Sequence, residues 1–137
     1  MFDWLKRLGK QAPAPLTGAP AVRRQKTHSA LSGYVYQYYY EGQRPSATDG
    51  EEATEFVFDV TADRKASYPV SVFVPQPAVK AWERSHGRNI SGTERYAIAK
   101  MALFQAFDER ENPEKMREPV TVDEVAVESI LATLEID

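Results

Sequence analysis

The chain has 137 residues, enough for one domain and a short appendage. It contains no cysteine, which excludes a disulfide framework, a thiolate metal site and a cysteine nucleophile. No apolar run reaches the length of a membrane-spanning helix, and Lys6 and Arg7 interrupt any signal-peptide core. We therefore expect a cytoplasmic protein, with attachment to the inner face of a membrane as an alternative.

Charge divides the chain into two unlike parts. Residues 1–30 hold six basic residues and one acid, net +5, whereas residues 31–137 hold 11 basic and 19 acidic residues, net −8. A split of this kind is typical of a tethering tail joined to an acidic domain. We assign residues 1–9 to an amphipathic helix, 10–30 to a Pro/Ala-rich basic linker, and 31–137 to a single α+β domain.

The first segment is amphipathic if it is helical. Steps of 100° place Phe2, Trp4, Leu5 and Leu8 on one arc, and the polar residues on the opposite arc. Such a helix can lie on anionic lipid or dock in a groove of a partner or of its own domain. A disordered leader is the alternative. The residues predicted to bind a membrane or a partner are Phe2, Trp4, Leu5, Lys6, Arg7 and Leu8.

The next segment, 10–30, is rich in proline and has too few apolar side chains for a core. Pro13, Pro15 and Pro20 favour an extended, semi-rigid chain. A small basic cluster follows, made of Arg23, Arg24 and Lys26. It fits a solvated linker, with contact to phosphate or lipid headgroups as an alternative.

Three segments then have the composition and alternation of strands. Residues 34–41 are rich in tyrosine, 55–62 alternate apolar and polar side chains, and 68–74 place three valines in phase. The connections are short, which favours an antiparallel meander.

Helical signals follow the strands. Residues 77–85 form a short helix with proline in its first turn, and Ser91 with Glu94 forms a capping box before an apolar helix over 95–109. Val120 and Val122 favour a short strand. A capping-box pattern at 121–124 precedes a terminal amphipathic helix. The predicted order is β-β-β-α-α-α, with two or three helices in a two-layer α+β domain.

Five of the seven tyrosines lie within residues 34–40. Alternation puts four on one face, and we predict that this face binds protein: Tyr34, Tyr36, Tyr38 and Tyr40. Alternatively the rings cover the sheet as packing. Residues 33–43 contain no basic residue and the domain is acidic, which argues against nucleic acid.

Catalytic and metal-binding patterns are weak. Two histidines without cysteine argue against zinc, and the phosphate-binding, dinucleotide-binding and nucleophile-elbow motifs are absent from the sequence. His86, Arg88 and Lys100 are the groups that could line an enzyme pocket. We predict no catalytic residue, metal or cofactor outside that alternative.

These patterns favour a non-enzymatic protein-binding or adaptor module of the cytoplasm. It would bind a partner or itself through the tyrosine face or the apolar helix over 95–109. The alternatives are a small enzyme around His86, Arg88 and Lys100, and a peripheral membrane protein that contacts anionic lipid through residues 2–10.

Overall fold

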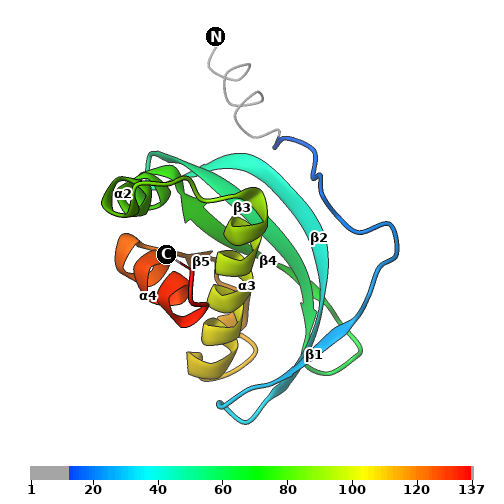
Figure 1. Cartoon of the computed structure of the whole chain (residues 1–137). Coiled ribbons are helices and arrows are strands. Elements are labelled where there is room, and N and C mark those ends of the chain that lie inside the picture. The colour runs from blue at the N-terminus through cyan, green and yellow to red at the C-terminus, as the bar shows by residue number, and fades with distance from the viewer. Residues whose placement is uncertain (1–12, 137) are drawn as a thin grey trace, which may run out of the picture.

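The computed structural model describes residues 13–136. These residues form a mixed α+β fold in which a curled five-stranded sheet is covered on its concave side by helices (Figure 1). The helix predicted over 1–9, with its candidate contact residues, lies outside the described residues. None of the helices that the structure describes is long and apolar enough to span a membrane.

The sheet has the order β1-β2-β3-β4-β5. The first four strands pair antiparallel, and β5 pairs parallel to β4. The strands are β1 (Lys26–Ser29), β2 (Val35–Thr48), β3 (Glu51–Thr61), β4 (Tyr68–Pro75) and β5 (Val120–Thr121).

The predicted three-stranded meander corresponds to β2, β3 and β4, but the sheet is larger than predicted. Strand β1 falls in the segment expected to be linker, because Lys26–Ser29 is polar and has no strand-like alternation. It is an edge strand that forms by pairing its backbone with β2. The short strand expected near Val120 is confirmed as β5. Strands come first and helices follow, except that β5 precedes the last helix.

Three α-helices are described: α2 (Gln76–His86), α3 (Gly92–Glu109) and α4 (Glu124–Thr133). The capping box of α3 is confirmed, since Glu94 N donates to Ser91 Oγ at 3.1 Å and Ser91 N donates to a Glu94 carboxylate oxygen at 2.9 Å. The cap of α4 is Asp123, which accepts from Ala126 N at 2.8 Å. The predicted capping box at 121–124 was therefore wrong by two residues, because Thr121 belongs to β5.

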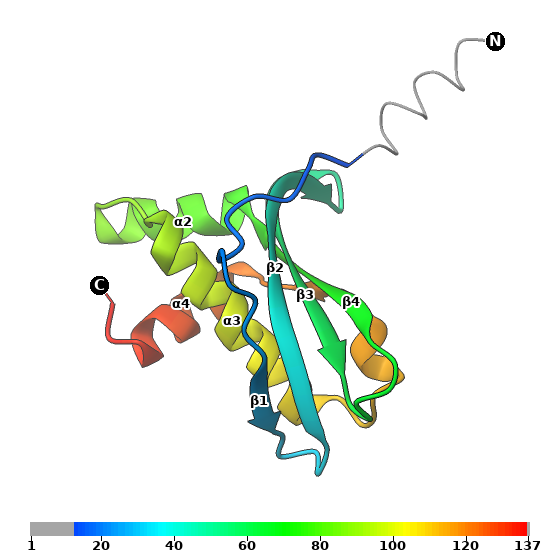
Figure 2. The same cartoon turned by 90° about the vertical axis from the view of Figure 1, so that its right-hand side faces the viewer.

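Helix α3 lies in the hollow of the curled sheet, and α4 packs beside it on the side away from the sheet (Figures 1 and 2). Aromatic and branched side chains fill the space between sheet and helix. The largest fully buried side chains there include Tyr36, Phe56, Phe58, Ile98, Leu103 and Phe107. This core holds β2 firmly against α3, which fixes the position of the tyrosines.

Candidate functional site

The tyrosines of β2 divide between the core and the surface. Tyr36 is 0% exposed and Tyr38 5% exposed, whereas Tyr34 is 39% exposed and Tyr40 is half-buried. The Tyr36 ring stacks on Phe107 with centroids 4.4 Å apart. Two of the four tyrosines predicted to contact a partner thus pack against the chain itself. Tyr34 and Tyr40 are the more exposed members of the set, and Tyr38 keeps only a small exposed fraction.

Burial changes the acidity of these phenols. It raises the pKa of Tyr38 to about 12 and that of Tyr40 to about 12, with a smaller contribution from neighbouring Tyr96. Burial also raises the pKa of Tyr96. All three hydroxyls are therefore neutral at physiological pH and can donate hydrogen bonds.

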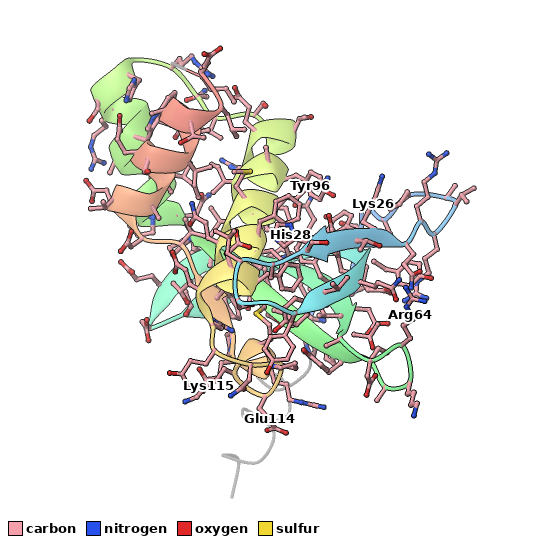
Figure 3. All side chains as sticks on the ribbon, turned by 90° about the horizontal axis from the view of Figure 1, so that it is seen from below. Lys26, His28, Arg64, Tyr96, Glu114 and Lys115 are labelled. Atoms are coloured by element: carbon pink, nitrogen blue, oxygen red, sulfur yellow. The ribbon has the colours of Figure 1, made fainter. Side chains whose placement is uncertain are left out.

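Tyr38, Tyr40 and Tyr96 line a groove of about 460 Å³, which we call the tyrosine groove. Tyr40 and Tyr96 come from different elements, and their ring centroids lie 4.7 Å apart. Arg24 and Lys26 line the same groove from the N-terminal segment. Figure 3 shows Lys26 and Tyr96 on the same side of the molecule. The fold has brought together two of the three residues of the basic cluster and part of the tyrosine face.

The N-terminal segment passes along the edge of β2 before it becomes β1. Thr17 and Gln43 exchange two backbone hydrogen bonds of 2.9 and 2.8 Å, and Lys26 pairs with Tyr38. Between these pairs the eight residues 18–25, here called the strap, face only the four residues 39–42. The excess length makes the strap bulge away from β2 (Figures 1 and 2). The tyrosine groove lies beside this bulge.

Gly42 allows the close approach of the strap's first anchor. It has a φ of 125°, and a Cβ at this position would lie 2.8 Å from the carbonyl oxygen of Thr17. It also lies at the register shift between β2 and β3. Glycine is therefore required here both by the backbone conformation and by the neighbouring chain.

The two adjacent arginines of the strap differ in their contacts. The Arg23 guanidinium lies 3.9 Å from the Tyr39 ring centroid, pairs with Glu41, and contacts Asp59 at 3.1 Å. It fastens the strap to the outer face of the sheet. Arg24 and Lys26 form no ion pair with any of the residues 13–136 and line the groove. The groove therefore carries two uncompensated positive charges.

The residues of the predicted enzyme pocket have other contacts. The His86 ring stacks on Trp82 with centroids 4.1 Å apart, and its Nε2 lies 2.9 Å from a Glu128 carboxylate oxygen. Arg88 pairs with Glu94 at 2.9 Å and also lies over Trp82.

Lys100 belongs to a different neighbourhood, with its Nζ 5.8 Å from the Phe104 ring centroid. The structure thus brings His86 and Arg88 together on Trp82 of α2, whereas Lys100 lies on α3. No group of three or more acidic or histidine side chains in the described part of the chain is arranged to hold a metal ion.

Sequence reasoning missed two features of this region. Tyr96 lies within the apolar helix predicted over 95–109, and Arg24 and Lys26 lie in the segment predicted as linker. These residues come together because β1 pairs with β2 and α3 packs against the sheet. A local sequence pattern predicts neither contact. The membrane-binding alternative concerns residues 2–10, outside the described residues, and stays a prediction.

The chain matches no family model, no curated protein and no solved structure. The chemistry of the tyrosine groove is therefore the basis for a function.

Proposed function

We propose that this protein is a non-enzymatic binding module that holds an extended acidic segment of a partner protein in the tyrosine groove. One observation carries the proposal: Arg24 and Lys26, which form no ion pair within residues 13–136, lie beside three tyrosine rings in one groove of about 460 Å³. Carboxylates of a partner would pair with the cations, and its apolar atoms would pack on the rings.

The tyrosines suit binding better than catalysis. With pKa values of about 12, the hydroxyls of Tyr38 and Tyr40 donate hydrogen bonds at neutral pH and are poor general bases. Their rings are held by packing against Phe58, so little side-chain freedom is lost when a ligand binds. A preformed aromatic surface of this kind favours recognition of a peptide.

Charge favours an acidic peptide over nucleic acid. Residues 31–137 carry a net charge of −8, and the groove offers only two cations. Nucleic-acid binding depends on neutralising many phosphates, so an acidic domain with two free cations is poorly suited to it. A short peptide with a few carboxylates needs only local positive charge.

The proposal is tested with a fluorescein-labelled octapeptide of alternating Glu and Tyr, compared with the same peptide carrying Gln in place of Glu. Fluorescence anisotropy measures binding to the wild type and to Arg24→Gln/Lys26→Gln. We expect the double substitution to weaken binding of the Glu peptide up to about tenfold, since two surface ion pairs contribute about 0.2–1 kcal/mol each.

The matched control is Lys80→Gln/Arg84→Gln, which removes two exposed cations from α2, on the far side of the molecule from β1 (Figures 1 and 2). This control has the same net charge as the groove variant and should bind like the wild type. Equal affinity for the Glu and Gln peptides, or equal losses in both double variants, would contradict the proposal. Tighter binding of an oligothymidylate than of the Glu peptide would assign the groove to nucleic acid instead.

A further inference from the structure

A second hollow, also of about 460 Å³, lies across the Thr17–Gln43 pair from the tyrosine groove. We call it the Arg95 hollow. Gln43 lines both hollows, and consecutive residues of α3, Arg95 and Tyr96, each line one of them. The other side chains that matter here are polar: Thr17, Ser46, Glu52, Thr54 and Gln76.

Arg95 has an unused hydrogen-bond donor. Its Nε is buried and has no hydrogen-bond partner among the residues that the structure describes. Buried donors in native proteins nearly always have a partner, because an unmade hydrogen bond away from water is costly. Arg95 also lines the hollow, so its guanidinium lies beside a polar space that a ligand carboxylate can enter.

Two arginines line the Arg95 hollow, and they differ in whether an acidic side chain already pairs with them. Arg44, in the same hollow, is held by Glu55 through two contacts of 2.9 and 3.3 Å, and Glu55 also accepts from Ser71 at 2.6 Å. Arg95 forms no ion pair within residues 13–136. Glu52 is the acid among the residues that line the hollow, and it is exposed.

We propose that the Arg95 hollow is a second carboxylate subsite, and that the partner segment crosses the Thr17–Gln43 pair to place one acidic side chain in each hollow. This inference rests on the proposed function. The guanidinium of Arg95 would donate to the second carboxylate, and Gln43 would contact the segment where it crosses.

The register of β2 sets the length of such a segment. The tyrosine groove extends along β2 from Tyr38 to Gln43, and the Arg95 hollow from Gln43 to Ser46. From Tyr40 to Ser46 a strand rises about 20 Å, at about 3.3 Å per residue. A partner that reaches both subsites therefore needs about six extended residues, whereas a shorter peptide occupies only one of them.

The test uses alternating Glu–Tyr peptides of two, four, six and eight residues. With the wild type, lengthening the peptide from two to four residues should raise the affinity by some factor. Lengthening it from four to six residues should raise the affinity by a factor about fivefold larger. Arg95→Gln should remove this additional increase and leave the affinity for the dipeptide unchanged. Arg24→Gln/Lys26→Gln should weaken binding at every length. Glu52→Gln should strengthen only the longer peptides, because it removes a competing carboxylate.

Lys65→Gln, at an exposed position of the connection between β3 and β4, is the single-charge control for Arg95→Gln. If Arg95→Gln does not fold, the Nε–H resonance of Arg95 in the wild type gives the answer. It should shift on addition of the hexapeptide and not of the dipeptide.

The outcomes separate the two proposals. If none of the peptides binds, the proposed function fails and the subsite with it. If peptides bind through Arg24 and Lys26 but Arg95→Gln keeps the length-dependent increase, or weakens all lengths alike, the subsite is wrong and the proposed function stands.

Discussion

The central sheet and its N-terminal edge are built on different principles. Strands β2, β3 and β4 present buried aromatic and branched side chains to α3, and these side chains form the core. The strap and β1 are exposed almost throughout and contribute almost nothing to that core. The core therefore positions the tyrosines, while the loosely packed edge supplies the two cations of the tyrosine groove.

The N-terminal edge of the sheet is nevertheless attached to α3 through β1. The His28 ring stacks on Phe104 with centroids 4.7 Å apart, and its Nε2 donates to the Asp108 carboxylate at 2.9 Å. Asp108 also accepts from Leu31 N at 3.0 Å. These contacts fasten β1 to the end of α3, so the strap is anchored by the Thr17–Gln43 pair on one side and by β1 on the other.

The largest effect should come from the core. Phe107→Ala removes a ring that is 0% exposed and stacks on Tyr36, so we expect a loss of about 3–5 kcal/mol in the free energy of unfolding. Urea denaturation followed by circular dichroism measures it. Tyr34→Ala, at the exposed end of the tyrosine face, is the comparison and should cost far less. Similar losses in the two variants would contradict the division of the tyrosines between core and surface.

The attachment of β1 should depend on pH. Burial raises the pKa of Asp108, but the hydrogen bonds from Leu31 and His28 outweigh burial and hold its pKa below the usual value. The lowered pKa means that this stabilisation is present above about pH 4, the pKa of an unfolded aspartate, and is lost as the pH falls through the folded-state pKa.

Asp108→Asn tests this attachment. It should cost about 1.5–3 kcal/mol, the contribution of a hydrogen bond to a charged group. Hydrogen exchange at pH 6 should accelerate at Leu31 and in β1, while amides of β3 keep their wild-type protection. Uniform acceleration across β1 and β3 would show that edge and core unfold together.

Removing either of two tyrosine hydroxyls should change the stability less, and the two changes should differ in sign or size. Tyr36 Oη is buried with no hydrogen-bond partner in the described part of the chain, whereas Tyr68 Oη donates to the carbonyl oxygen of Pro113 at 3.2 Å. Tyr68→Phe should lose about 1 kcal/mol, and Tyr36→Phe should be neutral or slightly more stable. Thermal denaturation of both variants checks the difference, and a clear loss in Tyr36→Phe would reveal a partner for that hydroxyl.

The most local effect should come from the strap. Thr17→Pro removes the N–H that donates to Gln43 O at 2.9 Å, and we expect a cost of about 0.5–1.5 kcal/mol, confined to the edge. Val22→Pro is the control, because Val22 is 65% exposed and forms no backbone hydrogen bond with β2. Limited proteolysis should cut the strap faster only in Thr17→Pro. Equal cutting of both variants would mean that the pair does not hold the strap.

The elements that the sequence predicted are those with local signals. The capping box of Ser91 and Glu94 begins α3 as expected, and β2, β3 and β4 follow from runs of aromatic and branched residues. Strand β1 could not be predicted in this way, because Lys26–Ser29 forms a strand only through pairing with residues 35–38. Its polar side chains suit a solvated edge as well as they suit a linker.

The candidate site was predictable only in pieces. Tyr38 and Tyr40 were recognised as a potential contact surface, but their alternation does not say which end of a strand is covered by a helix. Arg24 and Lys26 belong to the groove because β1 folds back on β2, and Tyr96 joins them from a helix far along the chain. Such a meeting of residues depends on tertiary packing, which is not encoded in any one segment.

The most direct test of the tyrosine groove is an NMR titration of the full chain with the alternating Glu–Tyr octapeptide. We predict that resonances of Lys26, Tyr40 and Tyr96 shift together and saturate with one dissociation constant, while those of Lys80 and Arg84 on α2 stay in place. Saturable shifts confined to another surface, or no shifts at peptide concentrations that bind by anisotropy, would contradict it.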